Sequence, residues 1–286
     1  MSSELPPPPS SGAWGETLPP VVESLPAPLP PPPATPAATF AEERPTATWS
    51  WWEALALFVI GNFVIGGIVV AGVVLVVLGD APSTTGGLDL PGIVASIAAD
   101  LTFIAAMVAY LQWRHPGWVR AVGFSERGRR LRDTVWGAIA GLLLYPAVSL
   151  GVGIFVTILF RAMFPGEDVK APEQLSDNLS AAGRVLATIL AVGIAPFTEE
   201  LFFRGLLYRS LRDRHGVRVA IVVSSLLFGL VHVTLAPWRD VVLLQSVMVF
   251  TGVGLAWVYE RRGLFASVAA HTVFNIIGVV LIFAWS

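Results

Sequence analysis

The chain of 286 residues is 55% hydrophobic and only 13% charged, whereas soluble domains carry about 25% charged residues. A net charge of −2 argues against nucleic acid as a partner. The sequence contains no cysteine, which excludes disulfides, thiolate metal sites and a cysteine nucleophile. The composition therefore predicts an all-α integral membrane protein whose main partner is the lipid bilayer.

Residues 1–46 differ from the rest because they hold most of the 22 prolines. Proline donates no backbone hydrogen bond and favours extended polyproline II conformation. We expect these residues to form a disordered cytoplasmic tail. A docking tail for a proline-recognising partner protein is the alternative interpretation. The first residues lack a basic stretch followed by an apolar one, so no signal peptide is expected.

After the tail, apolar segments follow one another, and most reach the roughly 20 residues that cross a bilayer. They cover 51–79, 91–112, 134–163, 184–208, 217–235, 240–260 and 264–284. We expect about seven transmembrane helices. The region 47–133 would hold the first helices and a basic loop, and 134–286 a second block with a polar intramembrane cavity in the C-terminal half of the chain.

Arginines predict the orientation of these helices. They gather in the loops 113–133, 209–218 and 261–263, which fall on one side when the helices alternate, while the opposite loops are acidic or sparse. Short basic loops remain cytoplasmic. We therefore expect a multi-pass protein of the plasma membrane with a cytoplasmic N-terminus.

A pair of carboxylates ends the fourth apolar segment. On a helix, Glu200 and Arg204 lie one turn apart in the order that favours an ion pair. Glu199 is rotated by about 100° and has no basic residue one turn later. One carboxylate can thus be neutralised by Arg204 while Glu199 is left as a candidate base. A structural cap at the membrane edge is the alternative reading.

Two histidines lie within apolar segments, where ionisable residues are costly and are candidates for function. His232 follows Phe228 at one-turn spacing, and His271 precedes Asn275 at the same spacing. Each motif alone is weak evidence, since a lone histidine is more often a hydrogen-bonding partner between helices.

Taken together, these residues could hydrolyse a peptide bond. Glu199 could activate water, His271 and Asn275 could stabilise the oxyanion, and His232 could position water or carry the proton. An equally legitimate assembly is a zinc site made of Glu199, His232 and His271. The sequence contains no His-Glu-x-x-His motif, and it leaves the choice between no cofactor and zinc open.

The order Glu-Glu-x-x-x-Arg (199–204), Phe-x-x-x-His (228–232) and His-x-x-x-Asn (271–275) resembles the CPBP family, over roughly residues 134–285. That family comprises intramembrane endopeptidases, including CAAX prenyl proteases and bacteriocin-processing and self-immunity proteins. The resemblance implies a helical membrane core with a polar cavity reached from the cytoplasm. It also implies that Glu199 is the catalytic carboxylate, supported by Glu200 and Arg204, with a site completed by His232, His271 and Asn275. We lean to a glutamate mechanism over a metalloprotease.

The expected substrate is a membrane-associated peptide or protein, and nothing in the chain selects a prenylated one. Two other functions remain possible. The chain could be a non-catalytic scaffold or immunity protein that keeps the fold. It could also be a transporter, although the first half contains no repeat of the motifs. Asp100, in the second apolar segment, is left outside the predicted site.

Overall fold

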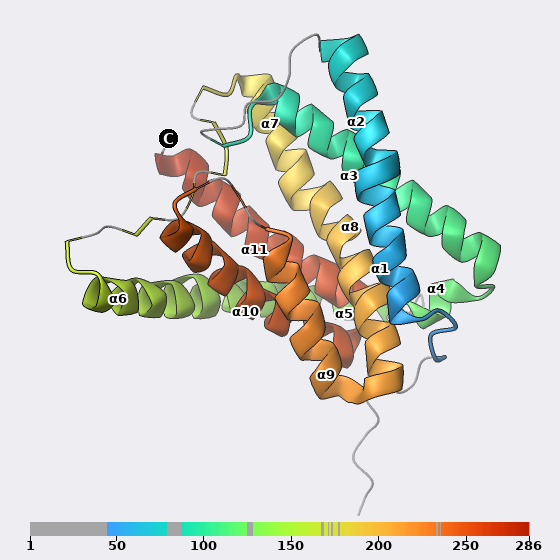
Figure 1. Cartoon of the computed structure of the whole chain (residues 1–286). Coiled ribbons are helices and arrows are strands. Elements are labelled where there is room, and N and C mark those ends of the chain that lie inside the picture. The colour runs from blue at the N-terminus through green and yellow to red at the C-terminus, as the bar shows by residue number, and fades with distance from the viewer. Residues whose placement is uncertain are drawn as a thin grey trace, which may run out of the picture. The chain divides into compact units, whose positions relative to one another are not determined.

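Helices make up nearly all the regular structure of the chain (Figure 1). The computed structural model describes residues 45–78, 87–124, 128–166, 169–170, 172, 174–176, 178–232, 234 and 236–285. Among these residues, the one β-type pairing is a single bridge between Leu88 and Leu175. The expected all-α membrane architecture is confirmed. The predicted tail 1–46 lies outside the described residues except for Pro45 and Thr46.

The first two membrane spans have polar caps at their starts. One is a continuous rod of α1 (Trp51–Val59), η1 (Ile60–Gly66), α2 (Gly67–Val73) and η2 (Val74–Leu78). Ser50 and Glu53 form a capping box at its start. The second span, α3 (Leu90–Arg114), begins where the Asp89 side chain accepts from the Gly92 amide at 2.8 Å.

A third span, interrupted by a π-helical stretch, follows the short α4 (Trp118–Ala121). It consists of α5 (Arg130–Tyr145), η3 (Pro146–Val152) and α6 (Gly153–Met163). The stretch begins at Pro146, which cannot donate to the helix ladder, so the pattern widens there. Leu143 and Phe155 are among the large apolar side chains exposed on this span, as expected where a helix faces lipid.

The predicted fourth and fifth segments form one run of helix. It comprises α7 (Ala181–Ile189), η4 (Leu190–Ile194), α8 (Ala195–Glu200), η5 (Leu201–Tyr208) and α9 (Arg209–Leu230). The described residues therefore contain six helices long and apolar enough to cross a membrane. Gly216 breaks the run with a φ of 83° and a ψ of 168°, a conformation that glycine tolerates. This break divides the run into two helical parts, which correspond approximately to the predicted segments 184–208 and 217–235.

The last two helices are joined by a tight turn. The helix α10 (Trp238–Arg262) ends at Gly263, whose φ is 81°, and α11 (Leu264–Trp285) follows at once. Gly137 and Gly141 of α5 lie against the backbone of Ala266 and Ala270 of α11, so that even a methyl group would clash. Small residues at one-turn spacing permit this close approach of helices in membranes.

The residues just before α1 are tied to a distant part of the chain. The Trp49 indole is buried and donates to the Leu206 carbonyl at 3.0 Å. The Ala47 amide donates to Asp213 at 2.7 Å, and Arg209 donates to the Pro45 carbonyl at 2.9 Å. The first span is thereby anchored to η5 and the start of α9.

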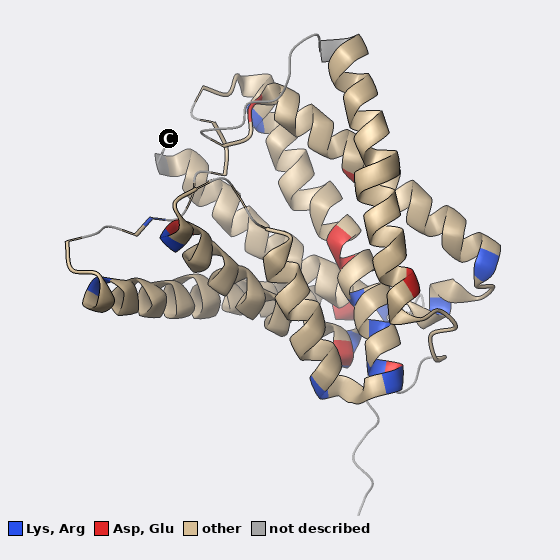
Figure 2. Ribbon diagram, in the orientation of Figure 1, with Lys and Arg blue, Asp and Glu red and all other residues tan. Residues whose placement is uncertain are grey.

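The two ends of the helix bundle differ in charge. We call the end with residues 113–124, 128–133, 209–218 and 261–263 the basic end, and the end with residues 87–89, 164–166, 178–180 and 236–240 the opposite end. Many of the basic positions lie toward the bottom and right of Figure 2, where α1 begins and α3 ends. This separation agrees with the loop alternation expected from the sequence.

Candidate functional site

The glutamate pair lies where α8 passes into the buried π-helical stretch η5. Glu200 and Arg204 are both fully buried, and Arg204 Nη1 donates to Glu200 Oε1 at 2.8 Å. Arg204 Nη2 donates to the Gly252 carbonyl of α10 at 3.1 Å. The ion pair expected from the sequence is therefore present, and it joins the glutamate helix to α10.

Glu200 has two further partners, both on α11. The Ser267 hydroxyl donates to Oε2, and His271 Nδ1 lies 3.0 Å from Oε1. Ser267 was not among the predicted site residues. It lies one helical turn before His271 on the same face, which is the sequence signal that could have identified it. Arginine, serine and histidine together satisfy the buried carboxylate.

Phe228 of α9 connects the three predicted motifs. Its ring lies 4.6 Å from the Arg204 guanidinium carbon, a cation–π contact. The same ring centroid lies 4.8 Å from that of His232 and 5.8 Å from that of His271. The phenylalanine thus contacts two imidazoles, one from the turn after α9 and one from α11.

Glu199 points away from this cluster toward the two other imidazole nitrogens. Its Oε2 lies 3.9 Å from His232 Nε2 and 3.9 Å from His271 Nε2. Although this oxygen is buried, no group among the described residues hydrogen-bonds it. The Glu199 side chain as a whole is 25% exposed, while that of Glu200 is inaccessible. A water molecule can bridge two such atoms, because two hydrogen bonds of about 2.8 Å span the gap.

The hydrogen-bond partners assign the tautomers of the histidines. His232 Nδ1 lies 2.6 Å from the Phe228 carbonyl, and His271 Nδ1 faces the Glu200 carboxylate. Both partners are acceptors, so both Nδ1 atoms carry hydrogen. In the neutral rings the Nε2 lone pairs then face Glu199. His232 itself lies in the turn just after α9, not inside a helix as predicted.

Asn275 lies on the next turn of α11 and is bonded to η4. Its Nδ2 donates to the Ala191 carbonyl at 2.8 Å, and Thr272 donates to the Val192 carbonyl at 3.0 Å. A primary amide has two N–H groups, and this bond uses one of them. Asn275 therefore pins α11 to the glutamate helix while lining the cavity described below.

Glu199, His232 and His271 have the atom types that bind zinc, but the distances between these atoms are longer than in a zinc site. Two imidazoles and a carboxylate are common zinc ligands, at about 2.0–2.2 Å from the metal, which puts neighbouring donors in a tetrahedral site roughly 3.3 Å apart. Here the two nitrogen–oxygen distances are 3.9 Å. Among the described residues, no group of three His, Cys, Asp or Glu side chains is arranged to hold a metal ion.

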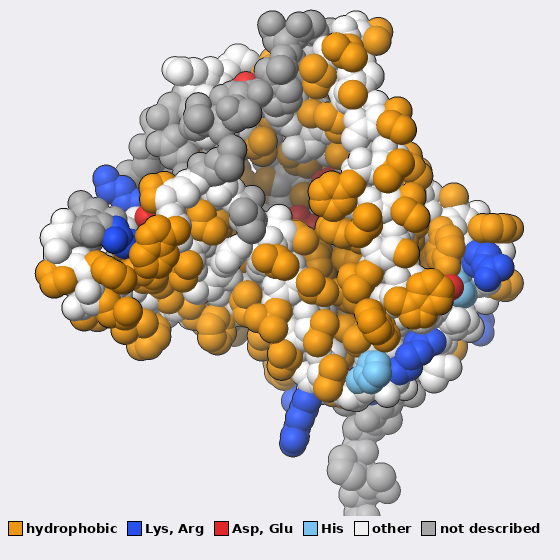
Figure 3. All heavy atoms as spheres, viewed as in Figure 1, with side chains coloured by type: hydrophobic (Ala, Val, Ile, Leu, Met, Phe, Trp, Pro, Cys, Tyr) orange, Lys and Arg blue, Asp and Glu red, His pale blue; other side chains and the backbone are white. Residues whose placement is uncertain are grey.

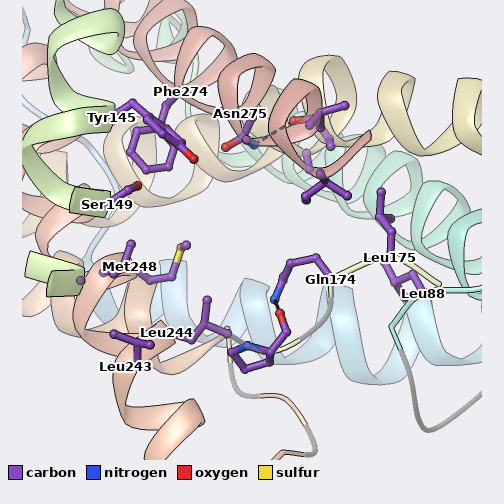
Figure 4. Close-up of a pocket in the computed structure, with 18 of the residues that line it drawn as sticks. Leu88, Tyr145, Ser149, Gln174, Leu175, Leu243, Leu244, Met248, Phe274 and Asn275 are labelled. Carbon is purple, nitrogen blue, oxygen red and sulfur yellow. Dashed lines mark hydrogen bonds between the residues drawn. The ribbon is translucent and has the colours of Figure 1, made fainter. Parts of the chain in front are cut away.

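A cavity of about 850 Å³ adjoins Glu199. Figure 4 shows Tyr145, Phe274 and Asn275 on one side of it and Leu244, Met248 and Gln174 on the other. Most of its wall is apolar. A hollow with acidic side-chain atoms in its depth is also visible on the face drawn in Figure 3. The cavity extends from Glu199 to residues of the opposite end, such as Leu88 and Leu175, whereas the family resemblance implies access from the cytoplasm.

Comparisons with known proteins point to membrane proteases. Residues 181–277 match the model of the family described as "Type II CAAX prenyl endopeptidase Rce1-like", which confirms the expected resemblance over that part of the chain. The chain is also 26% identical over 145 residues to "Putative membrane peptidase YdiL" of Bacillus subtilis (strain 168), which covers 50% of this chain. The match spans 54% of that relative, about half its length. No solved structure matches the chain.

Proposed function

From the match of residues 181–277 to the Rce1-like endopeptidase family, we propose that this membrane protein is an intramembrane endopeptidase. Its substrate would be a membrane-associated peptide or protein, and Glu199 would be its general base. The observation that carries the proposal is the difference in hydrogen bonding between the adjacent carboxylates of Glu199 and Glu200. Glu200 is hydrogen-bonded by Arg204, Ser267 and His271, whereas Glu199 Oε2 faces two imidazoles and has no hydrogen-bond partner in the part of the chain that the structure describes.

In the proposed first step, Glu199 takes a proton from a water molecule placed between its carboxylate and the imidazoles. The water oxygen forms a bond to the scissile carbonyl carbon, and the carbonyl π electrons move to its oxygen. The lone pair on His232 Nε2 helps to orient the water by accepting its second hydrogen. His271 cannot turn away because Glu200 holds its other nitrogen at 3.0 Å.

The tetrahedral intermediate then needs a donor for its oxyanion and a proton for the leaving nitrogen. The second N–H of Asn275, which also lines the cavity, is the proposed donor. The carbon–nitrogen bond breaks as the proton held by Glu199 passes to the nitrogen, directly or through His232. The products are a new carboxyl group and a free amine.

The test is a cleavage assay with the full chain in lipid nanodiscs and a library of membrane peptides. Glu199→Gln is expected to lower the cleavage rate about 10²–10⁴-fold, since positioned general bases contribute that much. Asn275→Ala is expected to lower it less, and Leu143→Ala, on the lipid-facing side of α5, is the neutral control. Wild-type cleavage that survives in Glu199→Gln would overturn the assignment of the base.

The same assay in the presence of a chelator tests whether cleavage depends on a metal ion. A glutamate peptidase keeps its activity after chelation and dialysis. Loss of activity that zinc restores, accompanied by stoichiometric zinc that is absent from His232→Ala, would instead assign Glu199, His232 and His271 as ligands. The two histidines would then need to approach Glu199 more closely than 3.9 Å.

A further inference from the structure

The helix that carries the proposed base has an interrupted hydrogen-bond ladder about one turn earlier. The Ala195 amide bonds to the carbonyl of Leu190, five residues back, instead of the carbonyl four residues back, that of Ala191. The next residue, Pro196, is buried and has no N–H to donate. An N–H at that position would reach Ala191 in a π-helical pattern or Val192 in an α-helical one. The proline therefore leaves these two carbonyls without their usual donor within the helix.

Two side chains of α11 bond to these carbonyls. Asn275 Nδ2 donates to the Ala191 carbonyl at 2.8 Å, and the Thr272 hydroxyl donates to the Val192 carbonyl at 3.0 Å. Figure 4 shows the bond of Asn275 as a dashed line. A proline within a membrane helix is tolerated where side chains of a neighbouring helix satisfy the backbone groups that it leaves unpaired. The interruption of one helix thus gives α11 two points of attachment to it.

These bonds form one of two attachments between α11 and the run of helix that carries the glutamates. The other attachment is at Glu200, which Ser267 and His271 contact. The two helices run in opposite directions, since α11 begins at the basic end and α8 leads toward it. Glu199 therefore lies between the attachment at Glu200 and the attachment at η4. Together the two attachments fix both the level and the rotation of α11 beside the proposed base.

The level and rotation of α11 decide which of its side chains face Glu199. A shift by one residue along a helix moves a side chain by about 1.5 Å and turns it by about 100°. His271 Nε2 lies 3.9 Å from Glu199 Oε2 while the neighbouring Thr272 bonds to η4, so one register satisfies both contacts. Catalytic groups need placement within about 0.5 Å. A misplacement of about 1 Å can lower a reaction rate by about 100-fold.

We propose that Pro196 and Thr272 are positioning residues of the active site and act together through the Val192 carbonyl. The proline removes the helical donor of this carbonyl, and the threonine hydroxyl takes the place of that donor. Both residues act through the placement of α11, and neither is assigned a chemical step. The inference rests on the proposed peptidase function, because it concerns the alignment of that reaction's base with the imidazole and amide of α11.

Cleavage kinetics of the full chain in lipid nanodiscs test the role of the hydroxyl, with a library peptide that the wild type cleaves. Thr272→Val keeps the shape of the side chain but removes the donor, so kcat should fall about tenfold while KM changes less than about twofold. Thr272→Ser should recover kcat to within about threefold of the wild type, because it restores the hydroxyl. An equal loss in Thr272→Ser would overturn the proposal.

The matched control for the hydroxyl is Thr188→Val. Thr188 lies on the same run of helix as Glu199, and its hydroxyl donates to the Arg184 carbonyl of its own helix at 2.8 Å. This bond joins no second helix, so its loss should leave both kcat and KM unchanged. If Thr188→Val lost as much activity as Thr272→Val, the bond between the helices would have no special role and the proposal would fail.

Replacing the proline separates positioning from stability. Pro196→Ala supplies an N–H that competes with Thr272 for the Val192 carbonyl, so kcat should fall about tenfold. The unfolding equilibrium constant should not rise, because alanine favours a helix interior and proline disfavours it. Pro146→Ala in the third span is the control, since the carbonyl four residues before it belongs to Leu142, whose side chain is exposed. An unchanged kcat, or equal losses in both proline variants, would overturn the positioning role.

The double variant Pro196→Ala with Thr272→Val tests whether the two residues act through the same carbonyl. With an N–H at residue 196, the carbonyl has a donor in its own helix. Removal of the Thr272 hydroxyl should then lower kcat by less than about twofold further, because changes that share one interaction are not additive. A total loss of about 100-fold, as expected for independent effects, would overturn the proposal.

Unfolding in mixed micelles keeps this inference separate from the proposed function, because it needs no substrate. Thr272→Val should raise the unfolding equilibrium constant about threefold, the average effect of one such bond in a membrane protein. The rise should vanish in the Pro196→Ala background. If Glu199→Gln kept wild-type cleavage, the proposed base would fail while the unfolding data still showed the shared carbonyl. If Glu199→Gln lost cleavage but Thr272→Val cleaved normally, the peptidase function would stand and the positioning role would fail.

Discussion

Glu199 and Glu200 are neighbours in sequence but lie in two contrasting regions of the molecule. The Glu200 carboxylate has three side-chain partners: Arg204 at 2.8 Å, His271 at 3.0 Å and the Ser267 hydroxyl. Around Glu199, one side opens into a cavity of about 850 Å³, and the imidazole nitrogens stand off at 3.9 Å. Glu200 therefore belongs to a closed ionic cluster, whereas Glu199 is a polar group at the edge of a mostly apolar cavity.

If Glu199 is the base that we propose, the contrast shows how a membrane protein can hold a reactive group rigidly without neutralising it. The closed cluster fixes His271 and the end of α8, and Arg204 extends it to α10. These contacts hold the backbone of Glu199, while its own oxygen remains available. The proposed function thus assigns reactivity to Glu199 and stability to its neighbour Glu200, and mutations should separate the two.

The largest effect on stability is expected from Glu200→Gln. It leaves the Arg204 guanidinium buried without its counter-charge, which typically costs about 3–5 kcal/mol. Unfolding in mixed micelles with increasing denaturant measures the loss. Glu199→Gln is the matched control, and it should unfold within about 0.5 kcal/mol of the wild type, as substitutions away from such features do.

The double variant Glu200→Gln with Arg204→Met refines this comparison. Removing both charges should recover part of the lost stability, because replacing a whole buried pair is milder than breaking it. Equal losses in Glu199→Gln and Glu200→Gln would mean that the two regions do not differ as described.

Gly141→Leu is expected to have an intermediate effect, acting through the helix that carries His271. A side chain at Gly141 would collide with the backbone of Ala270, so α11 must move away from α5. Such overpacking costs about 1–3 kcal/mol, and it should also lower the cleavage rate by displacing His271. Leu142→Ala, at the next position and exposed to lipid, should change neither quantity. Normal activity in Gly141→Leu would show that the contact does not position the histidine.

Ser267→Ala is expected to give the smallest effect. It removes one hydrogen bond to Glu200 while Arg204 and His271 remain, and such bonds within membrane proteins average about 0.6 kcal/mol. The same unfolding assay should register the change, with Ser246→Ala as control, since that hydroxyl bonds only within its own helix. A loss as large as that of Glu200→Gln would mean that the serine, and not the arginine, dominates the cluster.

Local helical geometry was enough to predict the contact between Glu200 and Arg204. The spacing of Glu200 and Arg204 predicted the ion pair and left Glu199 over, because residues four apart share a helix face. The same spacing placed His232 with Phe228 and His271 with Asn275. The all-α membrane class followed from composition alone.

Other features depend on contacts between distant segments, which spacing does not reveal. No local pattern indicated that Asn275 would donate to Ala191 or that Arg204 would reach the Gly252 carbonyl. Hydropathy predicted two separate segments on either side of Gly216. In the structure, the helix bends at this one residue and then continues. The apolar stripes of the cavity look like lipid-facing stripes in the sequence, because both bear the same residue types.

The anchoring of Trp49 has a consequence for the order of assembly during synthesis. Its indole bonds to the Leu206 carbonyl, 157 residues later in the chain. At about 5–20 residues per second, the ribosome makes that partner roughly 8–30 seconds after the tryptophan. The native anchoring of the start of the first span can therefore form only after η5 has been synthesised.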